Sequence, residues 1–150
     1  MHVKFTLNNK VVEIDVKPNE ILLDTLRYRF GLKSVKRGCE RGECGVCTVL
    51  LNDNPVYSCM VLTVSIDGSR ITTIEGLIED SLFKKIINSF TYSGAIQCGY
   101  CTPGFIITTY ALLKKHESIN RDIVIKHIEG NLCRCTGYKK IIDAVINASK

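Results

Sequence analysis

Apolar and polar residues alternate with a period of two over residues 3–7 and again over residues 12–16. This pattern is typical of strands that bury one face. Asn8-Asn9 separates these two runs, and Asn52-Asp53-Asn54 separates residues 49–51 from residues 56–59, so each predicts a hairpin turn. The strands expected on this basis cover residues 3–7, 12–16, 49–51, 56–59 and 71–74.

One short helix interrupts the strands. Apolar residues at Ile21, Leu22 and Leu26 follow a helical spacing, and Gly31 is a plausible end point. Asn19 precedes this run and is the residue type that caps helix N-termini, so we predict it as the cap. A charged, glycine-rich loop is expected from residue 33 to residue 47.

The second half changes to a period near 3.6, which predicts amphipathic helices. Pro103 suits the first turn of one of them, and Asn120 suits the N-cap of another. The sequence therefore predicts an α+β protein whose boundary lies near Gly76, with domains of residues 1–76 and 77–150. The helices expected cover residues around 82–90, 103–113, 121–128 and 139–146.

Charge and composition narrow the classes of function. The formal net charge is +5, but Lys and Arg are scattered and no basic patch interleaved with aromatic residues predicts nucleic-acid binding. No run of residues has the length of a membrane span, and residues 1–16 lack the pattern of a secretory leader. We therefore expect a cytoplasmic protein with no membrane partner. Thiols stay reduced there, so eight cysteines favour metal binding over disulfides.

The first four cysteines have the spacing of a plant-type [2Fe–2S] ferredoxin: Cys39, Cys44 and Cys47 on one loop, then Cys59. Three thiolates on one loop can surround one side of a cluster, and the fourth closes the cage from another element. Glycines between them let backbone N–H groups approach the sulfurs. A zinc ribbon or inert core thiols are the alternatives, but structural zinc usually draws on pairs of C-x2-C.

The other four cysteines form a C-x2-C pair, Cys98 and Cys101, and a C-x-C pair, Cys133 and Cys135. Both pairs lie in turns between predicted helices, so four thiolates can meet at one end of a helical domain. By ligand type alone, zinc remains a competitor at this second group.

Four strings of residues decide between these alternatives because together they resemble one family. They are GCERGECGVC from Gly38 to Cys47, TIEGL from Thr73, QCGYCTPGF from Gln97 and GNLCRCTGY from Gly130. In this order they are similar to the small iron–sulfur subunit of the molybdenum hydroxylases. That family includes xanthine oxidases, aldehyde oxidoreductases, aerobic carbon monoxide dehydrogenases and hydroxybenzoyl-CoA reductases.

The resemblance implies an architecture and a set of metal ligands. Residues 1–76 would form a β-grasp ferredoxin-like domain, and residues 77–150 a four-helix bundle. Each domain would carry one [2Fe–2S] cluster, and Gln97 and Cys135 would contact the molybdopterin of a partner subunit. The implied ligands are Cys39, Cys44, Cys47 and Cys59 for the first cluster, and Cys98, Cys101, Cys133 and Cys135 for the second.

The resemblance also implies function and partners. The chain would be the electron-transfer subunit of a multi-subunit oxidoreductase and would have no catalytic residue of its own. Electrons would pass from molybdenum in a large molybdopterin-binding subunit, through both clusters, to FAD in a medium subunit, within a heterotrimer or its dimer. An aldehyde is the substrate that we expect. The alternatives are a free-standing ferredoxin-like electron carrier and a zinc-stabilised interaction module.

Overall fold

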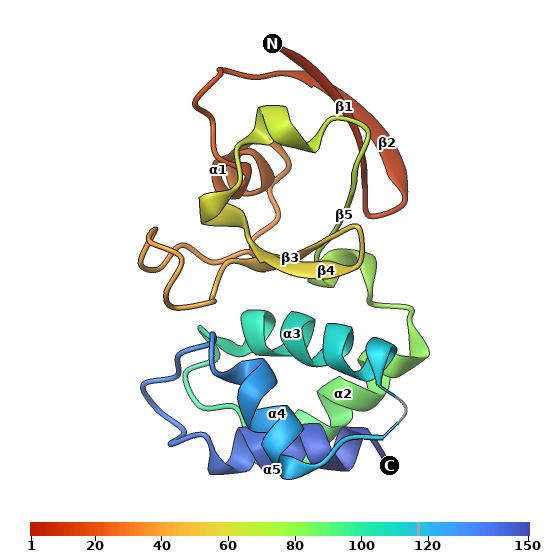
Figure 1. The fold of residues 1–150 in the computed structure, drawn as a ribbon, viewed down its shortest axis with the longest axis vertical. Coiled ribbons are helices and arrows are strands. Elements are labelled where there is room, and N and C mark those ends of the chain that lie inside the picture. The colour runs from red at the N-terminus through yellow and green to blue at the C-terminus, as the bar shows by residue number, and fades with distance from the viewer. Residues whose placement is uncertain (117) are drawn as a thin grey trace.

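A computed structural model describes residues 1–116 and 118–150 and places the strands in the first half of the chain and the long helices in the second (Figure 1). Five strands form one mixed sheet in the order β2-β1-β5-β3-β4. The α+β class is therefore confirmed. The strands are β1 (His2–Leu7), β2 (Lys10–Asp15), β3 (Thr48–Leu51), β4 (Asn54–Tyr57) and β5 (Arg70–Thr72).

Both predicted hairpins are present. β1 pairs antiparallel with β2, and β3 pairs antiparallel with β4. The turn residues Asn8, Asn9, Asn52 and Asp53 all have positive φ, between 48° and 66°. Such left-handed pairs suit tight hairpins, and Asn and Asp tolerate them better than other side chains. β5 is the central strand and joins the two hairpins, because it runs parallel to β1 and antiparallel to β3.

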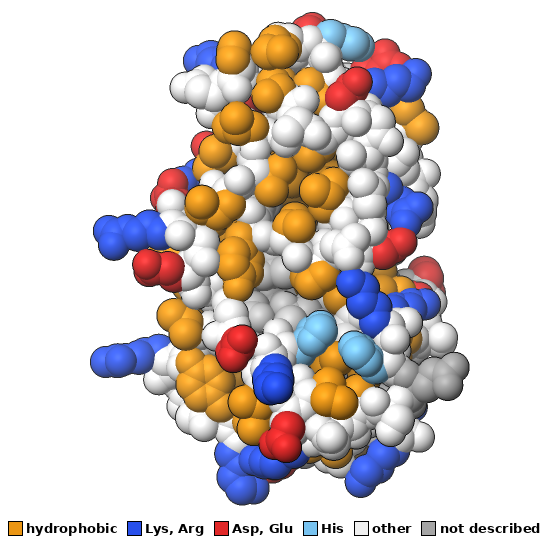
Figure 2. Space-filling view, viewed as in Figure 1, with side chains coloured by type: hydrophobic (Ala, Val, Ile, Leu, Met, Phe, Trp, Pro, Cys, Tyr) orange, Lys and Arg blue, Asp and Glu red, His pale blue; other side chains and the backbone are white. Residues whose placement is uncertain are grey.

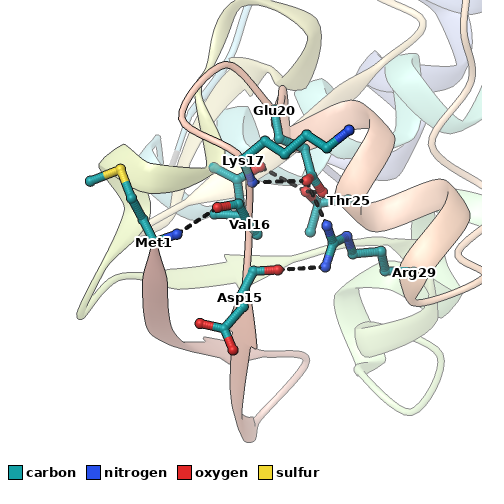
Figure 3. Close-up of polar contacts among 8 residues, drawn as sticks. Met1, Asp15, Val16, Lys17, Glu20, Thr25 and Arg29 are labelled. Carbon is teal, nitrogen blue, oxygen red and sulfur yellow. Dashed lines mark hydrogen bonds and ion pairs between the residues drawn. The ribbon is translucent and has the colours of Figure 1, made fainter.

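The short helix forms, but its predicted cap is wrong. α1 (Leu22–Asp24) continues into a π-helical turn (Thr25–Arg29), its N-cap is Ile21, and no side chain caps it. Glu20 anchors the segment instead, because its carboxylate accepts hydrogen bonds from the Thr25 hydroxyl at 2.8 Å and from Arg29 Nη2 at 2.7 Å (Figure 3). Asn19 is exposed.

Four helices follow the sheet, and local sequence accounts for where they begin. Asp80 caps the first of them by accepting from the Phe83 N–H at 3.0 Å. Asn120 is confirmed as a cap, since its Oδ1 accepts from the Ile123 N–H at 2.9 Å. Pro103 lies in the first turn of its helix, also as predicted. The helices are α2 (Ser81–Tyr92), α3 (Thr102–Lys115), α4 (Arg121–Ile128) and α5 (Lys139–Ala148).

Two hydrophobic cores stabilise the molecule, one between the sheet and the α1 segment and one among the later helices. α3 lies between them: it contacts β3 and β4 on one side and α2 and α4 on the other (Figure 1). Residues 104–112 of α3 are accordingly all buried. Leu50 of β3 packs into the helical core, so the two halves share apolar contacts as well as a chain connection.

The surface carries charges of both signs. On the face shown in Figure 2, Lys and Arg side chains lie both at the outline and within it, and they are interspersed with Asp and Glu. Within residues 1–116 and 118–150, no helix has the length and apolar character needed to cross a bilayer.

Candidate metal centres

The first four cysteines meet at one end of the sheet. Cys39, Cys44 and Cys47 lie on the loop that leads into β3, and Cys59 lies on the 3-10 turn that follows β4. Their thiols come together as two pairs: the side chain of Cys39 lies against that of Cys44, and the side chain of Cys59 lies against that of Cys47. Cys47 and Cys59 are buried, whereas Cys39 and Cys44 are half-buried.

Backbone N–H groups converge on the sulfurs of this first group. Cys39 Sγ accepts from the N–H groups of Arg41, Glu43 and Cys44, each at 3.4 Å. These donors, with that of Arg41 the strongest, lower the pKa of the Cys39 thiol to about 7. Sequence reasoning expected such donors between the ligands, and the structure supplies them. Cys39 is therefore well prepared to bind metal as a thiolate.

Burial and neighbouring thiols act in the opposite direction at Cys59. Burial, followed by contact with Cys47, raises the pKa of Cys59 to about 11, although the Gly42 N–H donates to its sulfur. Gly42 has a φ of +73°, which a glycine adopts without strain. A buried thiol with such a pKa becomes a thiolate only when a cation compensates the charge. Metal would supply that cation.

The second four cysteines meet beside the N-terminus of α3. Cys98 and Cys101 precede that helix, while Cys133 and Cys135 lie between α4 and α5. These thiols also form two pairs: the side chain of Cys101 lies against that of Cys133, and the side chain of Cys135 lies against that of Cys98. Burial raises the pKa of Cys101 to about 12. Cys98 and Cys135 are exposed, so this group opens toward the surface, and the exposed side chain of Gln97 lies next to Cys98 in the chain.

Sequence reasoning did not single out Thr136 and Tyr138, which both contact Cys133. Thr136 donates to Cys133 Sγ twice, from its hydroxyl at 3.0 Å and from its N–H at 3.3 Å. Burial alone would raise the pKa of Cys133, but these hydrogen bonds outweigh it and lower the pKa. The Tyr138 hydroxyl accepts from the Cys133 N–H at 3.0 Å. A hydroxyl residue three positions after a cysteine of the C-x-C pair was the available signal.

The two cysteine groups adjoin each other across the seam between the sheet and the helices. The Leu132 N–H donates to the Cys44 carbonyl at 2.9 Å, which links the two cysteine loops directly. The Tyr57 hydroxyl donates to the Gly130 carbonyl at 2.8 Å. Asn131 Nδ2 donates to the Gly45 carbonyl at 3.0 Å in a buried position. The groups are thus held at a fixed separation by hydrogen bonds from both halves.

All eight cysteines are free thiols in the structure. Among the described residues, no three His, Cys, Asp or Glu side chains lie close enough to share one metal ion. The thiols instead meet two by two. A [2Fe–2S] cluster needs this arrangement, because each of its two irons takes two cysteine sulfurs.

Comparison with known families agrees with this reading. Residues 5–71 match the family described as "2Fe-2S iron-sulfur cluster binding domain". Residues 73–146 match the family described as "[2Fe-2S] binding domain". The two matches meet between residues 71 and 73, and together they span almost the whole chain.

Individual relatives extend the comparison. The nicotinate dehydrogenase small FeS subunit of Eubacterium barkeri is 48% identical over 143 residues, which cover 95% of this chain and 91% of the relative. The aldehyde oxidoreductase of Megalodesulfovibrio gigas is 37% identical over 147 residues, which cover 96% of this chain but 16% of that longer protein.

A solved structure gives the same result for the fold. The crystal structure of quinoline 2-oxidoreductase from Pseudomonas putida 86 superposes with a TM-score of 0.93 and 40% identity, over 99% of this chain and 93% of the matched chain. The chain therefore belongs to the family of iron–sulfur subunits of the molybdenum hydroxylases, in which it is an electron-transfer subunit with two [2Fe–2S] clusters.

Proposed function

We propose that each group of four cysteines holds one [2Fe–2S] cluster. The observation that carries this proposal is the pairing of the thiols, Cys39 with Cys44 and Cys47 with Cys59 in the first group. The same pairing recurs between Cys101 and Cys133 and between Cys98 and Cys135 in the second. Each pair would bind one iron. When bound, the clusters supply one-electron transfer, which divides the two-electron oxidation of a substrate into single steps.

Iron analysis and two single substitutions test the ligand assignment. The purified holo-chain should contain about four iron and about four acid-labile sulfide per chain. Cys47→Ser should remove the first cluster and Cys101→Ser the second, so each variant is the control for the other. Electron paramagnetic resonance of the reduced variants would show which signal is lost. Zinc without sulfide, or loss of both signals from either substitution, would contradict the assignment.

We infer that the chain consists of a β-grasp ferredoxin-like domain of residues 1–76 and a four-helix bundle of residues 77–150. Two hydrophobic cores support this division: the buried residues of one all lie within residues 3–71, and the helical core takes a single buried residue, Leu50, from the first half. The boundary follows the 3-10 turn Ile74–Gly76. The Ser34 hydroxyl donates to the Glu75 carboxylate at 2.7 Å and so ties this turn to the first domain. Each half should keep its secondary structure when the other loses its cluster, which circular dichroism of the two serine variants would measure.

We further propose that the face around the second cysteine group meets a large molybdopterin-binding subunit, and that a medium FAD-binding subunit completes a heterotrimer or its dimer. Exposure of Gln97, Cys98 and Cys135 supports a contact at this face. The Gln97 amide can donate and accept hydrogen bonds at once, which suits the edge of a pterin. The eight free thiols support the cytoplasm as the compartment.

Substitution of Gln97 tests the pterin contact in the intact complex. Gln97→Ala should slow reduction of the second cluster by substrate, because the amide no longer positions the pterin beside it. Reduction of the isolated chain by dithionite should be unchanged, which provides the control. Stopped-flow absorbance would measure both rates. Equal substrate-driven rates in the variant and the wild type would place Gln97 outside the contact.

The partner subunit would select the substrate, and we keep an aldehyde as the proposal, which the aldehyde oxidoreductase relative supports. A nitrogen heterocycle is the second candidate, because the relatives named for nicotinate and quinoline are 48% and 40% identical to this chain. Assay of the intact complex on aldehydes and on nitrogen heteroaromatics, nicotinate and quinoline included, would distinguish them. Turnover of heteroaromatics alone would exclude the aldehyde.

A further inference from the structure

The Thr136 hydroxyl points its proton at a cysteine sulfur. Its oxygen lies 3.0 Å from Cys133 Sγ and accepts a hydrogen bond from the Tyr138 N–H at 3.3 Å. A threonine hydroxyl carries a single proton. Because the Tyr138 N–H occupies the acceptor side of the oxygen, that proton is left to donate to the sulfur.

The surrounding loop holds this donor in place. Tyr138 has a φ of +68°, an unusual value for a residue other than glycine, and its hydroxyl accepts from the Cys133 N–H at 3.0 Å. Its ring packs edge-on against Phe105, with centroids 6.4 Å apart. Tyr138 therefore holds the backbone N–H of Cys133, while Thr136 holds the sulfur of the same residue. The protein, rather than solvent, sets the distance between the hydroxyl and the sulfur.

This hydrogen bond differs in kind from those at the first cysteine group. The donors to Cys39 Sγ there are backbone N–H groups, which no substitution except one to proline removes. Across residues 1–116 and 118–150, Thr136 is the only residue whose side-chain hydroxyl donates to a cysteine sulfur. The second group thus has a donor that a single substitution can delete while the backbone stays intact.

We propose that Thr136 is a positioning residue that sets the reduction potential of the second cluster, an inference that rests on the proposed ligation of that cluster by Cys133. Reduction adds a negative charge to the cluster and its sulfurs. A hydrogen bond to sulfur stabilises the more negative state and so raises the potential. The hydroxyl therefore makes the second cluster a better electron acceptor than the same four thiolates without it.

Two substitutions at this position separate the hydroxyl from the shape of the side chain. Thr136→Val removes the hydroxyl and keeps the branched shape, whereas Thr136→Ser keeps the hydroxyl. Thr102→Val is the matched control, since Thr102 also neighbours a cysteine, Cys101, but its hydroxyl donates to no sulfur in the described part of the chain. Redox titration of the full holo-chain, followed by electron paramagnetic resonance, measures both potentials in one sample.

Thr136→Val should reduce the equilibrium constant for one-electron reduction of the second cluster about tenfold, a shift of about 59 mV to more negative potential. Thr136→Ser and Thr102→Val should keep the wild-type value, and the first cluster should not move in any variant. An unchanged potential in Thr136→Val would overturn the inference. So would loss of the second cluster in that variant alone, because Thr136 would then support the loop. A wild-type chain that binds no second cluster would contradict the proposed function itself.

Discussion

Replacing Gly104 with alanine tests the seam that joins the two halves. Gly104 lies in α3, where alanine favours the helix over glycine by about 1 kcal/mol. In this position, however, an added Cβ would lie 2.3 Å from the Gly45 carbonyl oxygen and 3.2 Å from Asn131 Nδ2. Helix propensity and packing therefore predict opposite signs for the change in stability.

The distances indicate that packing outweighs propensity. A carbon and an oxygen atom need about 3.5 Å, so the helix and the Gly45 loop must separate by about 1 Å. Forcing one methyl group into a packed seam costs about 1–3 kcal/mol. The same movement breaks the buried bond from Asn131 Nδ2 to the Gly45 carbonyl, and a buried polar group without a partner costs about another 1–3 kcal/mol. The net loss should be at least about 1 kcal/mol, which lowers Tm by ~2–4 °C.

Urea unfolding of the holo-chain, followed by far-ultraviolet circular dichroism and visible absorbance, would measure this loss. Thr91→Ala is the control, because Thr91 is an exposed residue of α2 that lies away from the seam. Its replacement therefore raises helix propensity without adding an atom to the seam. The control should be as stable as the wild type or slightly more stable. If Gly104→Ala were also as stable as the wild type or more stable, the close approach of α3 to the Gly45 carbonyl would be refuted.

Two further changes have defined outcomes. Tyr57→Phe leaves the Gly130 carbonyl without its donor at 2.8 Å and should cost about 1 kcal/mol in urea unfolding, whereas an unchanged midpoint would mean that water replaces the hydroxyl. Burial would raise the pKa of Glu75, but hydrogen bonds from Thr73 and Ser34 outweigh it and hold the pKa below 4.5. This carboxylate thus stabilises the fold above pH 4.5, and the contribution is lost as the pH falls through the folded pKa. Glu75→Gln should therefore be less stable than the wild type at neutral pH, by a margin that narrows below pH 4.5, and a margin independent of pH would contradict this.

Features that depend on neighbouring residues could be predicted from the sequence. Asn120 caps α4 and Pro103 begins α3 because each acts on groups within one helical turn. The Asn8-Asn9 turn follows from the tolerance of asparagine for positive φ. The Asn19 cap failed because Glu20 reaches both Thr25 and Arg29, and those contacts stabilise the segment without a capping side chain.

Contacts between distant segments could not be predicted in the same way. Asn131 and Gly45 are 86 residues apart, and nothing in either local sequence says that the amide of one reaches the carbonyl of the other. Gly104 looks like a weak helix residue until the Gly45 carbonyl is placed against it. The spacing of the cysteines indicated which four thiols form each group. Which two thiols pair within a group could be seen only in the folded structure.

The seam between the halves has a consequence for how such proteins can recombine. The chain reads as two modules, yet the contact between them needs Gly45 from one side and both Gly104 and Asn131 from the other. A chimera that takes one module from a relative will assemble only if these three positions remain compatible. A graft is therefore best designed by transplanting these seam residues along with the cysteines.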